Sequence, residues 1–152
     1  MLNLENFDMI VKLEEEARAT EAEIFLGDYD ADKSRKEIES ALKNPAFSSA
    51  HCMMCVDDNG RALGCVDFAT VASYSFGGNL QAYVDWVYVL KEFRHQGIAQ
   101  MLFSHMADYL KGMGVNEYFL LTAENSDAQK FYHGLEGAEI SNREVLRKNI
   151  SS

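Results

Sequence analysis

The sequence predicts an α+β fold, or mixed α/β fold, with one central sheet and about four helices. Three observations support this class. Helical and strand patterns follow the order α-α-β-β-β-α-β-α-β. Asn59-Gly60, a strong signal for a tight hairpin, lies between two apolar strands. A strongly apolar strand over Ala82–Leu90 leads through a short turn into a helix. At 152 residues, the chain is predicted to form a single domain over residues 1–152.

Two helices are expected in the first part of the chain. Four apolar residues recur at helical spacing within residues 5–20, namely Phe7, Ile10, Val11 and Leu13. A second helix is predicted to begin at Asp32 as its N-cap and to end at Asn44-Pro45, because the residue before proline avoids helical geometry.

The strands and the later helices follow from apolar runs and turn signals. Strands are expected over residues 51–56 and 63–71, on either side of the hairpin turn, and residues 73–81 are expected to form a loop. After the strand at 82–90, a helix should run to about Leu110 and a short strand should cover 118–122. Ser126 can cap a last helix to about Gly134, and residues 138–150 are predicted to form one or two closing strands.

The overall charge excludes some classes of partner. Lys and Arg number 14 against 24 Asp and Glu, a net charge of −10, whereas a nucleic-acid-binding face should be basic. No apolar run approaches the roughly 20 residues needed to span a bilayer, and residues 1–16 lack the basic start of a signal peptide. We therefore expect a cytoplasmic protein with no nucleic-acid or membrane partner.

Neither the cysteines nor the histidines predict a metal site. Cys52 and Cys55 are three residues apart in a predicted strand, so their side chains should point to opposite faces. Buried thiols are the expected outcome for these two and for Cys65. The four histidines show no ligand spacing, and no metal is predicted.

The segment most informative about function is the turn between the apolar strand and its helix, which contains Arg94-x-x-Gly97-x-Ala99. The first turn of a helix offers unpaired N–H groups and the positive end of its dipole. Small residues let an anion approach that backbone, so the turn can hold a diphosphate. Arg94 can contact the anion or brace the loop. The alternative is a helix that merely starts near a glycine.

Two motifs in this part of the chain resemble those of a known family. Val89-x-x-x-x-Arg94-x-x-Gly97-x-Ala99 is similar to the acetyl-CoA signature of the GNAT superfamily of N-acetyltransferases. Residues 125–132 are similar to that family's Asn-x-x-Ala-x-x-Phe-Tyr motif. The resemblance implies a mixed, mostly antiparallel sheet that is splayed at its central strands. The chain departs from the family pattern in two places. Residues 133–138 run one residue longer than the family's segment and lack its final aromatic residue, and residues 1–6 leave little room for the family's first strand.

The resemblance also implies roles for individual residues, with acetyl-CoA as cosubstrate. The backbones of Val87 and Val89 would lie along pantetheine, and the Val87 N–H would stabilise the oxyanion. The diphosphate would bind the backbone of the turn, which comprises Arg94, His95, Gln96, Gly97, Ile98, Ala99 and Gln100. Asn125 would bond a pantetheine amide, and Tyr132 would protonate the leaving thiolate as general acid.

A general base is also needed, because an ammonium group must lose a proton before it attacks. Asp85 is the first candidate, since a charge within an apolar strand requires a reason. Asp67 on the returning hairpin strand is the second. The alternative for Asp85 is a carboxylate that faces solvent or is satisfied by loop N–H groups.

The acceptor is expected to be a cationic amine. Residues 1–40 hold 12 acidic and five basic residues, a net charge of −7, and the resemblance places the first two helices along the acceptor groove. Glu21 and Tyr29 are the predicted acceptor contacts, with further acids at 23, 28 and 30 and an aromatic ring at 25. The alternative is that these acids only keep the helices soluble.

The sequence therefore predicts an acetyl-CoA-dependent N-acetyltransferase that acts on a primary amine, in a small molecule or a peptide. A small cationic amine, a polyamine or an aminoglycoside-like compound fits the charge best. The alternative is a non-catalytic acyl-CoA-binding module or sensor with the same fold; a chance match in a generic α+β domain is the weakest reading. The sequence also allows a homodimer, formed through a sheet edge or the C-terminal strand.

Overall fold

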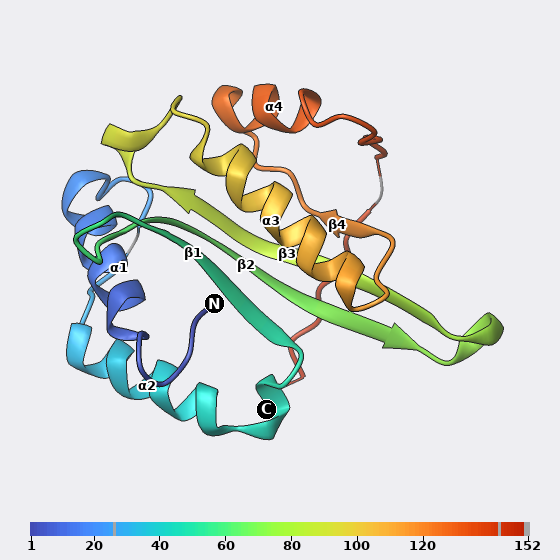
Figure 1. Ribbon diagram of the computed structural model, residues 1–152, viewed down its shortest axis with the longest axis horizontal. Coiled ribbons are helices and arrows are strands. Elements are labelled where there is room, and N and C mark those ends of the chain that lie inside the picture. Colours follow the sequence, from blue (N-terminus) through green and yellow to red (C-terminus); the bar gives the residue numbers. More distant parts are fainter. Residues whose placement is uncertain (26, 143, 151–152) are drawn as a thin grey trace. The chain divides into compact units, whose positions relative to one another are not determined.

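The computed structural model describes residues 1–25, 27–142 and 144–150. It divides the chain into two compact units, one over Met1–Leu120 and one from Leu121 onward (Figure 1). The single domain over 1–152 stays a prediction. Among the described helices, none is long and apolar enough to cross a membrane.

The described residues of the first unit form three α-helices and four strands. The helices are α1 (Asp8–Thr20), α2 (Ala31–Lys43) and α3 (Ile98–Gly112). The strands are β1 (Ala50–Val56), β2 (Ala62–Ser73), β3 (Asn79–Val89) and β4 (Tyr118–Leu120). Short 3-10 turns cover Pro45–Phe47, Ser75–Gly77 and Lys91–Phe93. This order confirms the predicted α+β class, although β2 and β3 extend further than predicted into the loop expected at 73–81.

The sheet is mixed and mostly antiparallel, as predicted. Its order is β1-β2-β3-β4; β2 is antiparallel to both of its neighbours, and β4 runs parallel to β3. The β3–β4 pairing runs only from Ala82 opposite Tyr118 to Val84 opposite Leu120. The rest of β3, residues 85–89, therefore runs past β4 with its edge unpaired on that side. This opening agrees with the predicted splay.

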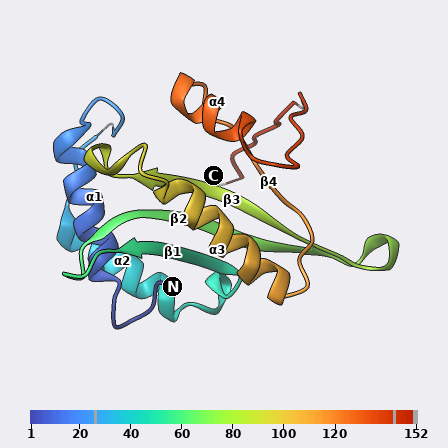
Figure 2. The same ribbon diagram turned by 45° about the horizontal axis from the view of Figure 1, so that its top comes forward.

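The two faces of the sheet carry different cores. On one face, α1 packs against residues of all three antiparallel strands, and the cluster consists of Ile10, Leu13, Ala17, Cys52, Ala62, Cys65, Tyr88 and Leu90. On the other face, Phe68 lies 6.0 Å from Tyr109 of α3 and 5.3 Å from His51, between ring centroids. Because neighbouring residues of a strand point to opposite faces, His51 and Cys52 belong to different cores. In both ribbon views α3 runs along the sheet, and α1 and α2 lie together at one end (Figures 1 and 2).

The hairpin between β1 and β2 forms as the sequence predicts. The Asp57 carboxylate accepts hydrogen bonds from the backbone N–H groups of Asn59 and Arg61, both at 2.9 Å. Gly60 has φ +80°, a left-handed conformation that glycine adopts without strain. The three cysteines are free; Cys52 and Cys65 are buried, and Cys55 is half-buried.

Two predicted elements need correction. The N-cap of α2 is Asp30 rather than Asp32, because the Asp30 backbone is extended and its carboxylate accepts from Lys33 N–H at 3.0 Å. The described part of the tail, residues 138–142 and 144–150, forms no strand. Leu146 and Ile150 are 89% and 93% exposed there, so apolar residues alone did not provide the paired neighbour that a strand requires.

Candidate functional site

The unpaired edge of β3 exposes peptide groups at the positions expected for cofactor binding. Leu90 N–H donates to Leu63 O at 2.9 Å, toward β2. Peptide groups alternate in direction along a strand, so those of Val87 and Val89 point the other way, to the unpaired edge. Arg94 Nε donates to Val89 O at 3.0 Å. The groups left for a ligand therefore include the Val87 N–H and C=O and the Val89 N–H.

A β-bulge explains why these peptide groups share an edge with the β4-paired part of the strand. Ala82 N–H donates to Glu117 O at 3.0 Å, on the β4 side. Asp67 pairs with Trp86 and Phe68 pairs with Val84, which leaves Asp85 as the extra residue. This residue shifts the alternation by one, so that odd-numbered residues after the bulge face the same edge as Ala82.

The turn after β3 brings together the residues predicted to hold the diphosphate. His95 has φ +60° and Gly97 has φ +83°, and Gly97 is the N-cap of the 15-residue helix α3. With no capping side chain there, the first N–H groups of α3, those of Ile98, Ala99 and Gln100, have no intrahelical partner. His95, Gln96 and Gly97 are exposed. The turn therefore presents accessible backbone N–H groups of the kind that bind anions, and the diphosphate site stays a prediction.

The Arg94 side chain ties this turn to Glu21 at the end of α1. Its guanidinium donates to both carboxylate oxygens of Glu21, with Nη1 2.9 Å from Oε1 and Nη2 2.5 Å from Oε2. Tyr88 OH donates to Glu21 Oε2 at 2.6 Å. Of the two roles predicted for Arg94, this geometry favours the brace, because Nε, Nη1 and Nη2 all have protein acceptors.

The same contacts change what can be expected of Glu21, the buried residue at the C-cap of α1, which is only 3% exposed. Burial alone would raise the pKa of this carboxyl, but the hydrogen bonds from Arg94 and Tyr88 hold it below its ordinary value. Burial and the bond to Glu21 raise the pKa of Tyr88. Glu21 as an acceptor contact stays a prediction, and the geometry favours a different role for it.

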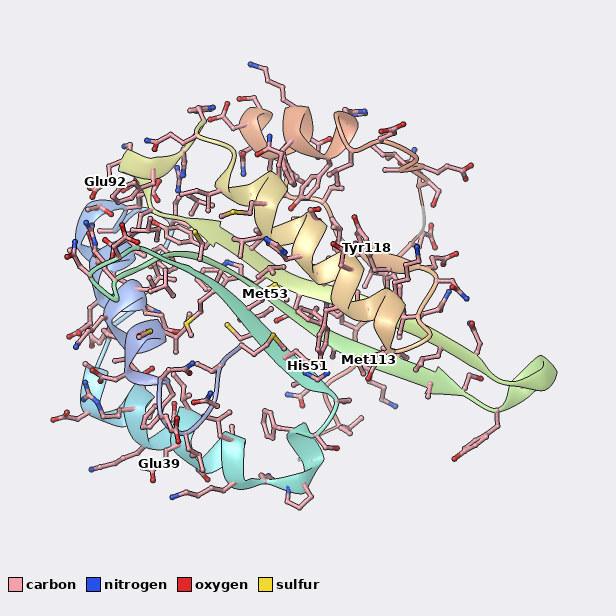
Figure 3. All side chains as sticks on the ribbon, in the orientation of Figure 1. Glu39, His51, Met53, Glu92, Met113 and Tyr118 are labelled. Atoms are coloured by element: carbon pink, nitrogen blue, oxygen red, sulfur yellow. The ribbon has the colours of Figure 1, made fainter. Side chains whose placement is uncertain are left out.

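A second brace joins the same elements at the surface. Arg61 bonds Glu16 of α1 and, at 2.7 Å, Glu92 of the turn that follows β3. Its guanidinium also lies 5.1 Å from the ring centroid of Phe93. Figure 3 shows Glu92 at the end of the sheet where α1 lies. The chain after β3, residues 92–94, is therefore tied to α1 by two arginines.

The two carboxylates proposed as general base differ in environment. Asp85 is exposed at the bulge, whereas Asp67 is half-buried on β2. Burial raises the pKa of Asp67; a hydrogen bond from Cys52 opposes the shift, and the negative charges of Asp85 and Glu14 add to it. A carboxylate with a raised pKa is a stronger proton acceptor, which favours Asp67 as a base. Both assignments stay predictions.

Residues 21–30 between α1 and α2 are called the acceptor-side segment after their predicted role. Its two aromatic side chains, Phe25 and Tyr29, contact other side chains of the protein. The Arg18 guanidinium lies 4.6 Å from the ring centroid of Tyr29 and 5.2 Å from that of Phe25. Tyr29 OH donates to Glu14 Oε2 at 3.1 Å. These two rings therefore already hold a cation of the protein itself, and Tyr29 as an acceptor contact stays a prediction that this packing does not favour.

The second unit carries the other predicted cofactor residues on helix α4 (Ser126–His133). Asn125 is its N-cap, and its side-chain oxygen accepts from Ala128 N–H at 2.8 Å. The Asn125 amide nitrogen remains the group that could bond pantetheine. Tyr132 is buried, and burial raises the pKa of its phenol. Its role as general acid stays a prediction.

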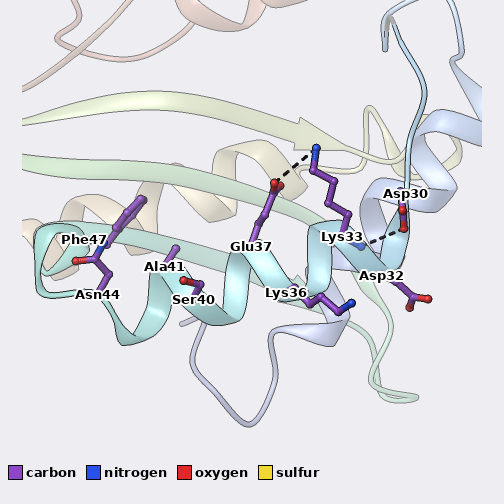
Figure 4. Close-up of a pocket in the computed structure, with 9 residues that line it drawn as sticks. All are labelled: Asp30, Asp32, Lys33, Lys36, Glu37, Ser40, Ala41, Asn44 and Phe47. Carbon is purple, nitrogen blue, oxygen red and sulfur yellow. Dashed lines mark hydrogen bonds and ion pairs between the residues drawn. The ribbon is translucent and has the colours of Figure 1, made fainter. Parts of the chain in front are cut away.

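No alternative site for chemistry stands out in the described parts of the chain. They hold no group of three or more His, Cys, Asp and Glu side chains that could bind a metal ion. A hollow of about 590 Å³ lies along the outer side of α2, and its described lining includes an ion pair of 3.8 Å between Lys33 and Glu37 (Figure 4). It contains none of the predicted cofactor or catalytic residues.

Comparison with known proteins agrees with this geometry. The model of the acetyltransferase (GNAT) family matches residues 11–135. The chain belongs to the acetyltransferase (GNAT) family. It is therefore an acetyl-transferring enzyme, and the predicted enzyme class is confirmed. No curated protein sequence matches this acetyltransferase.

Solved structures share its fold at low sequence identity. A probable acetyltransferase is 22% identical, with a TM-score of 0.77 over 99% of this chain and 96% of its own. An aminoglycoside acetyltransferase from an uncultured soil metagenomic sample, in complex with sisomicin, is 13% identical, with a TM-score of 0.78 over 99% and 93%. An aminoglycoside N-acetyltransferase in complex with CoA is 23% identical, with a TM-score of 0.61 over 78% and 87%.

Sequence reasoning missed two features of the site. It did not predict that Arg94 and Tyr88 both bond the Glu21 carboxylate. Arg94 is 73 positions from Glu21 in the sequence and Tyr88 is 67 positions from it, and no short sequence pattern reports such distant contacts. It also missed the bulge at Asp85. The polar residue within an apolar strand was the available signal for it, but that signal was interpreted as a catalytic base.

Proposed function

We propose that this acetyltransferase moves the acetyl group of acetyl-CoA to the primary amine of a small cationic molecule. The observation that carries the proposal is the backbone anion site at residues 94–100, placed directly after an unpaired strand edge. CoA ends in a long amide-containing arm that suits the edge and carries a diphosphate that suits the turn. GNAT acetyltransferases use acetyl-CoA, and the neighbour bound to CoA supports the same cosubstrate here.

The proposed reaction is a direct transfer. The amine nitrogen attacks the thioester carbonyl carbon, the C–N bond forms, and the C–S bond breaks. The Val87 N–H, on the unpaired edge, is the proposed donor to the developing oxyanion. The acceptor ammonium first gives one proton to Asp67, directly or through water, and then attacks as a neutral amine. Tyr132 protonates the leaving thiolate, and the second proton lost by the nitrogen returns through solvent to the Tyr132 phenolate. Asp85 remains the alternative base.

The acceptor class rests on charge rather than on aromatic contacts. Glu23 and Asp28 are exposed in the segment between α1 and α2, where they attract a cation. Other acids of this region are paired, including Glu21 with Arg94 and Asp8 with Arg35. The aminoglycoside acetyltransferases among the structural neighbours support an amino-sugar or polyamine acceptor.

The test is the rate of CoA thiol release from acetyl-CoA with a panel of acceptors. An aminoglycoside, a polyamine, a peptide with a free N-terminus and an anionic amino acid should be compared at low and high salt. We expect the highest kcat/KM for the cationic compounds and a decrease with salt. Tight acetyl-CoA binding without turnover of any amine would favour the non-catalytic sensor, and preference for the anionic acceptor would contradict the acceptor class.

A further inference from the structure

The Glu21–Arg94–Tyr88 cluster connects two regions that have different proposed roles. Arg94 is the first residue of the cofactor turn, and its backbone is followed directly by the left-handed His95. Glu21 ends α1 and begins the acceptor-side segment, since its N–H donates to Ala17 O at 2.9 Å and its C=O accepts from Ile24 N–H at 3.0 Å. Tyr88 supplies the third contact from β3.

Aromatic contacts extend this connection into the acceptor-side segment. The Phe25 ring centroid lies 5.6 Å from that of Tyr88 and 6.2 Å from that of Trp86. Trp86 and Tyr88 stack, with centroids 5.5 Å apart. The Arg94 guanidinium lies 5.5 Å from the Tyr88 ring centroid. The segment therefore rests on two stacked rings of β3, and one of them, Tyr88, belongs to the cluster.

The Glu21–Arg94 ion pair can hold the two segments in a fixed relative position. A bidentate pair between guanidinium and carboxylate fixes distance and orientation together. Glu21 is 3% exposed, so water cannot replace its partners without opening the contact. Removing one member of such a pair leaves the other charge unsatisfied and shifts the turn.

We propose that Glu21 is a positioning residue that couples the cofactor turn to the acceptor-side segment. It holds Arg94 so that the backbone of the turn, rather than the side chain, faces the diphosphate. This inference rests on the proposed function, because it requires CoA to bind at the turn. By reciprocity, a ligand that holds the turn also strengthens the Glu21 pair and orders residues 21–25.

The experiment measures CoA affinity by calorimetry and amide hydrogen exchange with and without CoA. In the wild-type protein, CoA should slow exchange at residues 21–25. Glu21→Gln should weaken CoA binding about tenfold, equivalent to losing one charge-assisted hydrogen bond, and should abolish that protection. Glu37→Gln removes the same charge from an exposed side chain of α2, outside residues 21–25, and should leave both CoA readouts unchanged.

A second variant separates coupling from loss of folding. Tyr88→Phe keeps the ion pair and its packing but removes one hydrogen bond to Glu21, so it should fold and show a smaller loss, about twofold to threefold in CoA affinity with reduced protection. A folded Glu21→Gln or Tyr88→Phe protein with wild-type affinity and full protection overturns the coupling alone. A wild-type protein that does not bind CoA overturns the proposed function, and the coupling with it.

Discussion

The cofactor turn, Arg94–Gln100, and the acceptor-side segment, Glu21–Asp30, are built by different means. The turn offers backbone N–H groups to the predicted ligand, and their positions are set by two left-handed residues and the start of α3. The groups of the segment are side chains, and their partners come from elsewhere in the chain, such as Arg94 for Glu21 and Glu14 for Tyr29.

The difference explains why one region is easier to interpret than the other. A backbone site depends on local conformation, so a short pattern of residues can specify it. A side-chain site depends on which groups remain free after the protein has satisfied its own charges, and that outcome depends on the whole fold. Four predictions test this division between a cofactor side and an acceptor side.

The largest effect is expected at the proposed general acid. Tyr132→Phe removes the phenol oxygen but keeps the ring, which lies 5.5 Å from that of Phe131, between centroids. Loss of a general acid typically lowers the rate by about 10²–10⁴-fold. We expect a fall of that size in kcat with acetyl-CoA affinity unchanged, measured by thiol release and calorimetry. Equal turnover in the two proteins would show that another group protonates the thiolate.

The next effect distinguishes the two candidate bases. Asp67→Asn should lower kcat/KM by about 10²-fold, whereas Asp85→Asn should retain most of the rate. Since burial raises the pKa of Asp67, the rate should rise with pH through a value above the ordinary 3.8. Asp85→Asn should move this rise to lower pH, because one repelling charge is gone.

Stability gives an independent check on Asp67. A carboxyl whose pKa is higher in the folded protein is destabilising at neutral pH, and the cost appears as pH rises through the unfolded and then the folded pKa. Asp67→Asn should therefore leave the melting temperature at pH 7 unchanged or slightly higher.

The rate measurements decide between the two bases. A large rate loss from Asp85→Asn, with little from Asp67→Asn, would assign the base to Asp85 instead.

The third effect isolates the backbone anion site. A Cβ at Gly97 would meet no protein atom within 4 Å, so the space above the turn is open to ligand. Gly97→Val should weaken CoA binding by at least about 30-fold, because the side chain fills that space and φ +83° disfavours a β-branched residue. Gly114→Val is the matched control, since Gly114 has φ +82° and is equally open. Similar losses of CoA affinity in both variants would mean that strain, not obstruction, is responsible.

The fold could be predicted further from the sequence than the site could. Helix and strand periods, the Asn59-Gly60 turn and the Gly97 turn are local, and the structure contains all of them. The prediction of one or two closing strands over residues 138–150 was wrong for the residues that the structure describes there, because a strand requires a paired neighbour that apolar residues do not guarantee. The β-bulge at Asp85 was not predicted, because a strand period alone does not show where one extra residue interrupts the alternation.

The acceptor side was the least predictable part of the molecule. Its composition correctly indicated many acids, but composition does not report which of them are neutralised. Arg61 and Arg94 lie far along the chain and pair with Glu16 and Glu21. Arg18 occupies the two rings that the sequence offered to a cationic ligand. What remains for an acceptor is therefore a small set of exposed carboxylates.

The smallest predicted effect tests that remaining set. Glu23 and Asp28 are exposed and lie in the acceptor-side segment. The double variant Glu23→Gln with Asp28→Asn should lower kcat/KM for a polyamine or aminoglycoside about threefold to fivefold at low salt, since exposed charges each contribute less than about 1 kcal/mol. The difference should shrink at high salt because the Debye length falls to about 3 Å at 1 M.

A matched control keeps this result specific to the segment. Glu37→Gln with Glu39→Gln removes two exposed or half-exposed carboxylates from α2, where they pair with Lys33 and Lys43. It makes the same change in net charge and should leave capture of the cation nearly unchanged. If both double variants lower kcat/KM equally, the acceptor responds to the net charge of the whole protein. The acceptor-side segment is identified as part of the acceptor site only if kcat/KM falls in the Glu23/Asp28 double variant alone and if that fall is absent for a neutral amine.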